Sequence, residues 1–265
     1  MVGPKDDHVF LVDPAVGDDD ARLRRYQALL TEDERARQAR FVFERDRRAF
    51  AVTRALVRVA LTRFAPVAPS DWRFAAAEHG RPVVSAPAGV PAPCFSVSHT
   101  AGLIACLVTR QPRAAVDVEQ LRVVEDAVAI AERNFVAAEV TALRACAGEA
   151  RRDLFLALWT LKESYLKALG RGLSLPLDAA VFRVAGDAID VRLAGEPVTG
   201  AEAEPGADSA PARWQFSLWR PTPNHCLALA RTWTSDRGLS PPRFVRLVPL
   251  ESEQPATVAL VAGSR

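Results

Sequence analysis

Apolar residues at helical spacing predict two helices near the start of the chain. Thr31 and Glu34 form the pattern of a capping box, in which each residue bonds the other's backbone amide, so a helix is expected to follow. That helix is expected to bend or break around residues 44–46. A second apolar face then continues to about Phe64, where nearby prolines end it.

The second half of the chain alternates between strand-like and helix-like patterns. Helices are predicted within 124–143 and over 153–169, where Gly170 suits the left-handed residue that ends a helix. Residues 83–93 and 195–212 are expected to be loops. Short strands are predicted at 95–98 and 102–109, separated by a turn at 99–101, and at 114–119, 181–184, 189–193, 213–219 and 226–233.

This mixture of helices and strands predicts an α/β (α+β) protein. The best boundary lies at residues 111–113, which gives an N-terminal half over 1–112 and a C-terminal half over 113–240. Residues 241–265 are expected to form a tail without regular structure. Helices framed by strands in both halves are compatible with a duplicated fold.

Composition narrows the class of protein. The chain has 265 residues and a net charge of only +2, which does not indicate a nucleic-acid-binding protein. Four scattered cysteines without paired spacing indicate free thiols in a reducing cytoplasm. No apolar run is long enough to predict a membrane span, and no signal peptide is recognised. The basic residues comprise 31 Arg and only three Lys, two of which are Lys162 and Lys167.

Asp117 and Glu119 are the first candidate site residues. Residues two apart on a strand point to the same face, so these two carboxylates are expected to converge. They repel each other unless a cation lies between them. Alone, such a pair is more often a solvated strand edge than a site.

The predicted helix over 153–169 carries the second group. Its apolar stripe indicates a core-facing side, while Trp159, Glu163 and Lys167 follow one another at four-residue intervals on a neighbouring face. Such a Glu–Lys pair is also a common surface stabiliser. Lys162 points elsewhere, and an acidic partner or a structural role is expected for it.

Three further features suit an anionic ligand. Ser96, Val97, Ser98 and His99 offer hydroxyl, backbone and imidazole donors at a strand end. The stretch 22–63 holds 12 Arg against five acidic residues, although solvated helix faces also have this composition. Gly80-Arg81-Pro82 is a tight turn with one cation.

In this order, the segments resemble the 4'-phosphopantetheinyl transferases of the surfactin-synthetase-activating (Sfp) type. The resemblance runs with gaps from about residue 35 to 184 and is most specific at two motifs. Residues 114–119 (AAVDVE) resemble the G-[IV]-D-[IV]-E strand, and residues 159–173 resemble W-x-x-K-E-[AS]-x-x-K-x-x-G-x-G-L. The segments at 96–99 and 80–82 resemble N-[IL]-S-H and G-K-P. The resemblance implies two similar α/β halves related by a pseudo-two-fold axis in a monomer.

The resemblance also implies roles for these residues. Asp117, Glu119 and Glu163 would hold Mg²⁺, or Mn²⁺ in its place, on the pyrophosphate of coenzyme A, the substrate. Glu163, Lys167 and His99 would be catalytic, with Glu163 the candidate base. The residues expected to bind coenzyme A are Arg37, Gly80, Arg81, Ser96, Val97, Ser98, His99, Asp117, Glu163 and Lys167.

The implied reaction moves the phosphopantetheine arm to a serine of an apo acyl or peptidyl carrier protein and releases 3',5'-ADP. No nucleic acid or membrane partner is expected. Two alternatives stay open: a coenzyme A-binding protein that does not transfer, and an Arg-rich nucleic-acid-binding domain. The second leaves the three carboxylates without a role.

Overall fold

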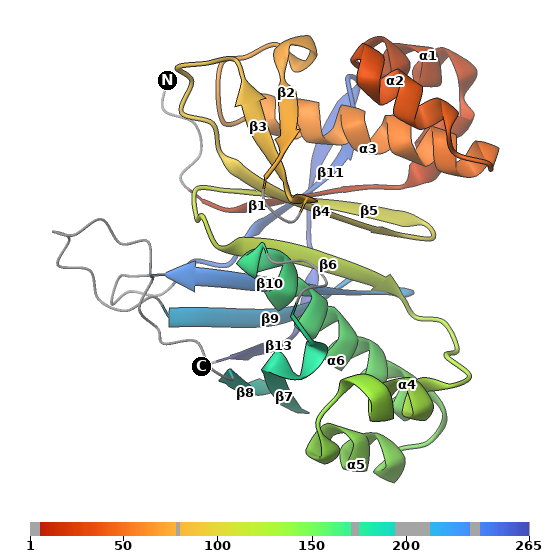
Figure 1. The fold of residues 1–265 in the computed structure, drawn as a ribbon, viewed down its shortest axis with the longest axis vertical. Helices are drawn as coiled ribbons and strands as arrows, with labels where there is room; N and C mark the ends of the chain where they lie inside the picture. Colours follow the sequence, from red (N-terminus) through yellow and green to blue (C-terminus); the bar gives the residue numbers. More distant parts are fainter. Residues whose placement is uncertain (1–5, 78–79, 171–174, 194–212, 234–238, 265) are drawn as a thin grey trace, which may run out of the picture. The chain divides into compact units, whose positions relative to one another are not determined.

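The computed structural model describes residues 6–77, 80–170, 175–193, 213–233 and 239–264 (Figure 1). The chain divides into two compact units. The first comprises Met1–Ala77, Pro82–Arg110 and Pro241–Thr257, and the second comprises Glu78–Arg81, Gln111–Ser240 and Val258–Arg265.

The first unit is a five-stranded sheet covered by helices. Its strands follow the order β12-β11-β1-β5-β4, in which β11 lies parallel to β1 and the other neighbours are antiparallel. A separate two-stranded ribbon pairs β2 with β3. The elements are β1 (His8–Val12), α1 (Asp20–Ala28), α2 (Glu32–Ala39), α3 (Glu44–Thr62), β2 (Arg73–Ala76), β3 (Pro82–Ala86), β4 (Cys94–Thr100), β5 (Leu103–Thr109), β11 (Arg243–Val248) and β12 (Ser252–Ala256).

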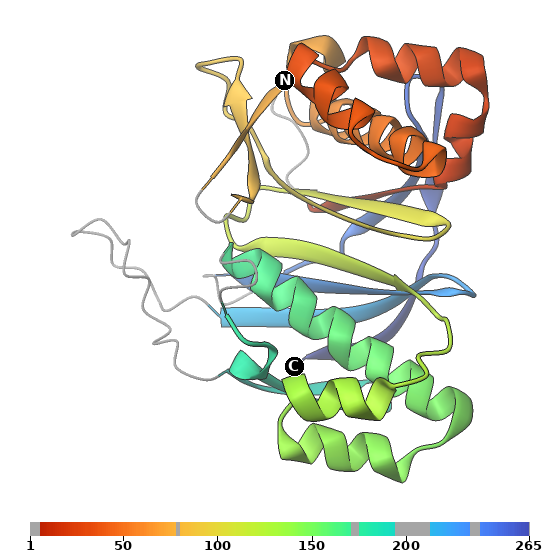
Figure 2. The same cartoon turned by 45° about the vertical axis from the view of Figure 1, so that its right-hand side comes forward.

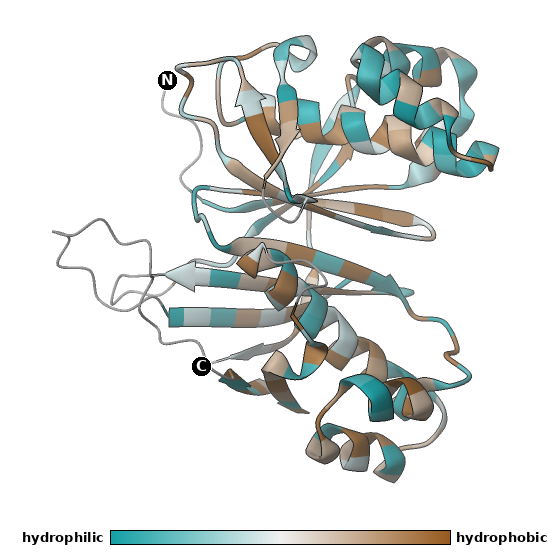
Figure 3. Ribbon diagram, in the orientation of Figure 1, coloured by the Kyte–Doolittle hydropathy of each residue, from teal (hydrophilic) through white to brown (hydrophobic). Residues whose placement is uncertain are grey.

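The long helix α3 supplies most of the core of the first unit. Its buried face, which includes Leu56 and Leu61, packs with Ile104 and Val108 of β5. The helices α1 and α2 are more polar, as their mostly teal colour in Figure 3 shows. They therefore cover the core from outside.

In the second unit, the described residues form a six-stranded sheet and three α-helices. The strand order is β6-β10-β9-β13-β8-β7, so β6 and β7 are the two edges. The elements are β6 (Ala114–Gln120), α4 (Ala127–Asn134), α5 (Ala137–Ala145), α6 (Gly148–Leu169), β7 (Ala180–Ala185), β8 (Ala188–Leu193), β9 (Arg213–Thr222), β10 (His225–Trp233) and β13 (Ala259–Ser264).

Helix α6 organises the core of the second unit. It packs against β6 and β10 and crosses the sheet obliquely in both views (Figures 1 and 2). Leu158, Leu161 and Tyr165 of the predicted stripe are buried in the core, and Leu154 and Leu169 pack partly against it. Gly170 ends the helix at φ 69°, a left-handed conformation that glycine adopts without strain.

Several local predictions are confirmed. The mixed α/β class is correct, and Thr31 and Glu34 form the predicted capping box, with Glu34 N donating to Thr31 Oγ1 at 3.2 Å. The chain breaks between α2 and α3 just before residues 44–46, as expected. The strands predicted in the second half correspond to β6, β7, β8, β9 and β10. The loop predicted at 195–212 lies outside the described residues.

Other local predictions are wrong. Part of the loop predicted at 83–93 is strand β3, which pairs with β2 through backbone hydrogen bonds. His99, placed in a turn by the sequence, is on β4, because β4 and β5 stay paired to Thr100 and Leu103. The window 124–143 holds two helices, α4 and α5, instead of one.

The expectation of a tail over 241–265 is also wrong. Strand β11 pairs with β1 and β12, while β13 pairs with β9 and β8. The physical reason is that the backbone groups of these short apolar segments form hydrogen bonds with strands far away in the chain. In the first unit β11 pairs with β1, more than a hundred residues earlier. In the second unit β13 pairs with β9, about forty residues earlier. None of the described helices has the length and apolar content needed to cross a bilayer.

Candidate active site on α6 and β6

Strand β6 presents two carboxylates to α6. Ala115 belongs to the core that α6 covers, and alternation along the strand places Asp117 and Glu119 on the same face. The register with β10 sets Asp117 opposite Ala228 and Glu119 opposite Cys226. The two acidic side chains are therefore held by a regular antiparallel ladder at a sheet edge.

Helix α6 brings Glu163 and Lys167 to this face. The Lys167 ammonium donates to Asp117 Oδ1, and the two atoms are 2.5 Å apart. Asp117 is buried, whereas about a third of the Lys167 side chain is exposed. The two strongest sequence motifs, 50 residues apart in the chain, thus meet through one ion pair.

Burial and neighbouring negative charge raise the pKa of the two glutamates of this site. Burial raises the pKa of Glu163, the Asp117 charge raises it further, and the Lys167 charge acts in the opposite direction. Burial also raises the pKa of Glu119, and the negative charges of Asp117 and Glu163 raise it further. The positive charges of Arg122 and Lys167 lower it. The site therefore gathers negative charge, which the charges of Lys167 and Arg122 oppose.

Arg81 lies in the same unit, at the end of α6. Its Nη1 donates to the carbonyls of Pro112 and Ala168, and its Nη2 to that of Ala114, each at 3.4 Å. A cation at this helix terminus is favourable, because the helix dipole places negative charge there. The neighbouring Gly80 has φ 82°, in the left-handed region where a side chain is strained.

The other predicted ligand residues belong to the first unit. Ser96, Val97, Ser98 and His99 lie on β4, where the two serines face one side of the strand and Val97 and His99 the other. Arg37 is on α2, with its guanidinium carbon 5.8 Å from the centroid of the Phe50 ring. Their roles at a site with α6 stay predictions.

Two arginines of the basic stretch have a structural partner that the sequence did not indicate. Glu34 pairs with Arg58 at 2.6 Å and with Arg54 at 3.3 Å, and Arg58 is fully buried. These contacts join α2 to α3. Part of the arginine excess in residues 22–63 therefore serves the fold.

Comparison with known proteins decides the family. The model of the 4'-phosphopantetheinyl transferase superfamily matches residues 113–230, and a model of the N-terminal part of 4'-phosphopantetheinyl transferases matches residues 19–111. The 4'-phosphopantetheinyl transferase Sfp of Bacillus subtilis is 31% identical over 160 residues, which is 60% of this chain and 69% of that protein. The chain belongs to the 4'-phosphopantetheinyl transferase superfamily.

Other transferases of this family are also similar. The 4'-phosphopantetheinyl transferase HetI of Nostoc sp. is 32% identical over 155 residues, which is 58% of this chain and 65% of HetI, a little under two thirds. A phosphopantetheinyl transferase of Thraustochytrium sp. is 26% identical over 257 residues, covering 91% of this chain and 84% of that protein. The family resemblance inferred from the motifs is confirmed.

The three carboxylates have the chemistry that a hard divalent cation requires of its ligands. Asp117, Glu119 and Glu163 are oxygen donors of the type that Mg²⁺ prefers, and their mutual repulsion would be relieved by a divalent ion. Among the residues the structure describes, no three His, Cys, Asp or Glu side chains form a cluster that could hold a metal ion.

The raised pKa of Glu163 predicts an effect on stability. Above the folded-state pKa, the ionised carboxylate is less favourable in the folded protein than in the unfolded chain, so it lowers stability at neutral pH. Glu163→Gln is expected to raise the melting temperature at pH 7.5, by about 2–4 °C for each kcal/mol recovered. The gain should disappear as the pH falls toward the ordinary carboxyl pKa of 4.5.

Differential scanning calorimetry between pH 4.5 and 8 measures this difference. The matched control is Glu125→Gln, because Glu125 is an exposed acid in the same unit. A Glu163→Gln protein that melts lower than the wild type at pH 7.5 would show that the carboxylate stabilises the fold, against the expectation.

Proposed function

We propose that this transferase moves the phosphopantetheine arm of coenzyme A onto a serine of apo acyl or peptidyl carrier proteins. The observation that carries the proposal is the contact between Lys167 and Asp117, which joins the two family motifs into one charged site. In the reaction the serine oxygen bonds to the phosphorus that bears the pantetheine. The bond from that phosphorus to the leaving oxygen breaks, and 3',5'-ADP departs.

Glu163 is proposed as the base that takes the serine proton. A general base works best when its pKa lies near the working pH. Burial and the Asp117 charge move the pKa of Glu163 in that direction, up from the usual range of an exposed carboxyl. The same effect that makes Glu163 costly to ionise therefore makes it a better proton acceptor.

The cations of the site are proposed to stabilise phosphate charge. Displacement at phosphorus depends mainly on positioning and on neutralising the charge of the phosphate oxygens. Lys167 offers a compact ammonium that is part-exposed beside Asp117. His99 and Ser98 are proposed to donate to the same phosphates from β4.

Asp117, Glu119 and Glu163 are proposed to hold Mg²⁺, or Mn²⁺ in its place. When bound, the ion supplies positive charge to the pyrophosphate oxygens and removes the repulsion among the three carboxylates. Their electrostatic coupling supports this assignment. Lys167, which donates to Asp117, is proposed to contact a phosphate of the substrate as well.

The 3'-phosphate end of coenzyme A is assigned to Arg37 and Arg81. Guanidinium groups bind phosphate oxygens in a two-pronged geometry. Gly80, Ser96 and Val97 would contribute backbone or hydroxyl donors. We further propose that the protein acts as a monomer in the cytoplasm, with its halves related by a pseudo-two-fold axis.

Intact-mass spectrometry of an apo carrier protein incubated with coenzyme A and Mg²⁺ tests the transfer. We expect the carrier to gain the mass of one phosphopantetheine group. Glu163→Gln and Asp117→Asn should each lower the rate roughly 10²-fold or more, because they remove the base and a charge-holding carboxylate. Both variants should keep the circular dichroism spectrum of the wild type.

Glu125→Gln serves again as the carboxylate control and should transfer at the wild-type rate. If coenzyme A binds but no carrier in a panel of acyl and peptidyl carriers gains mass, the protein is a non-catalytic coenzyme A-binding protein. Near-normal rates for Glu163→Gln would remove Glu163 from the role of base.

A substrate that lacks the 3'-phosphate tests whether Arg37 binds that group of coenzyme A. Arg37→Met is expected to raise KM for coenzyme A by roughly tenfold or more, since a hydrogen bond to a charged group contributes about 1.5–3 kcal/mol. With 3'-dephospho-coenzyme A as substrate, variant and wild type should have similar KM values. An equal increase for both substrates would show that Arg37 does not contact the 3'-phosphate.

A further inference from the structure

Lys162 of α6 and Glu139 of α5 form a buried ion pair in the second unit. The Lys162 side chain has no exposed surface and that of Glu139 is 2% exposed, with Nζ and Oε2 2.9 Å apart. Lysine is among the residues least often fully buried, and this chain contains only three of them. The proposed transfer chemistry makes no use of either side chain.

The Lys162 ammonium is bound on several sides. Besides Glu139, it donates to the carbonyl of Leu177 at 3.0 Å and to that of Ala180. The ring centroid of Phe135 lies 4.9 Å from the same nitrogen. Through this nitrogen, α6 is connected to the first turn of α5 and to the residues at the start of β7.

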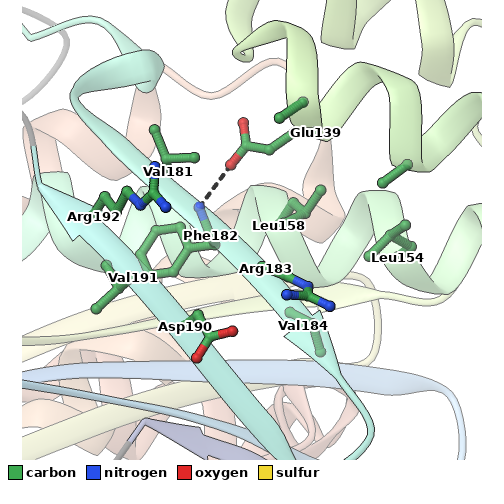
Figure 4. Close-up of a pocket in the computed structure, with 12 residues that line it drawn as sticks. Glu139, Leu154, Leu158, Val181, Phe182, Arg183, Val184, Asp190, Val191 and Arg192 are labelled. Atoms are coloured by element: carbon green, nitrogen blue, oxygen red, sulfur yellow. Dashed lines mark hydrogen bonds between the residues drawn. The ribbon is translucent and has the colours of Figure 1, made fainter.

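Glu139 completes the connection from the other side. Its Oε1 accepts from Phe182 N at 2.8 Å, and its Oε2 accepts from Val136 N at 3.2 Å as well as from Lys162. Figure 4 shows the carboxylate reaching from α5 to β7 at the wall of a cavity of about 460 Å³. Leu154 and Leu158 of α6 line the same cavity.

The position of Lys162 in the chain gives this pair its importance. Successive helix residues differ by about 100° in direction, so Lys162 and the adjacent Glu163 point to different sides of α6. Fixing the direction of one fixes that of the other. Lys167, one and a half turns further on, is fixed with them.

Stability alone does not account for a buried ion pair. Well-packed apolar residues of similar volume often stabilise a protein as much or more, because burying charges costs hydration. The contacts of this pair are, however, directional, whereas the burial of apolar surface is not, so the pair can fix the direction of a helix face.

We infer that Lys162 and Glu139 are positioning residues, which set the rotation of α6 and so hold Glu163 and Lys167 toward Asp117. The expected effect of this pair on the transfer rate rests on the proposed function. Its expected effect on the position of α6 does not. A purely structural pair would change stability and leave the folded enzyme's turnover unaltered.

The test compares Lys162→Met and Lys162→Arg with a core variant of the same unit, Ile189→Ala. Ile189 is buried on β8, and the variant loses packing without touching Lys162 or Glu139. Measured well below each melting temperature, Lys162→Met should lose about 10–100-fold in kcat, since small displacements of catalytic groups have effects of this size. KM for coenzyme A should change by less than about threefold, and Ile189→Ala should keep the wild-type kcat.

Lys162→Arg separates charge from position. It keeps the positive charge but has a longer, planar head that does not fit the carbonyls of Leu177 and Ala180 in the same way. Its kcat is expected to fall with that of Lys162→Met. If Lys162→Met does not fold, Glu139→Gln is the second variant, because it keeps an acceptor for Phe182 N.

Hydrogen–deuterium exchange of the peptide over residues 159–169 gives a result that does not depend on turnover. Exchange there should be faster in Lys162→Met than in Ile189→Ala, whether or not the wild type transfers phosphopantetheine. If the wild-type protein does not transfer phosphopantetheine, the proposed function is wrong. The exchange measurement alone then tests whether Lys162 and Glu139 position α6. A kcat within twofold of the wild type, or exchange no faster than in Ile189→Ala, would overturn the inference.

Discussion

The second unit depends on placing carboxylates on the covered face of a sheet. Asp117 and Glu119 project from β6 toward α6, where an apolar side chain would normally lie. Lys167 makes this arrangement possible by donating to Asp117 from the helix that covers the sheet. The apolar stripe of α6, with Leu158, Leu161 and Tyr165, provides the burial that holds the helix in place.

This arrangement leaves negative charge that is not fully compensated, and the proposed chemistry uses it. Burial and mutual repulsion raise the pKa of Glu119 and of Glu163, which is unfavourable for the folded protein alone. A bound divalent ion and a phosphate-bearing substrate would satisfy these groups together. The buried pair of Lys162 and Glu139 is inferred to hold the helix that carries Glu163 and Lys167.

Local patterns in the sequence predicted the elements of the site well. The apolar stripe and Gly170 predicted the helix over 153–169, and alternation predicted the strand over 114–119. Those signals lie within one element and its immediate ends. The family motifs implied that Asp117 and Lys167 belong to one site, but their direct contact was not predicted, because spacing alone does not show which strand a helix covers.

Interactions between distant segments were not predicted. Strands β11 and β13 depend on partners far away in the chain, and their short apolar runs do not identify those partners. Glu139 carries no sequence pattern that points to Lys162, 23 residues later. The pair becomes visible only when α5, α6 and β7 are placed in space.

A double-mutant cycle on Asp117 and Lys167 tests most directly whether charge joins α6 to β6. The free energy of unfolding is measured for the wild type, Asp117→Asn, Lys167→Met and the double variant. The structure predicts that the two substitutions are not additive, with a coupling energy of about 0.5–3 kcal/mol. Additive effects within the error of the measurement would contradict the account.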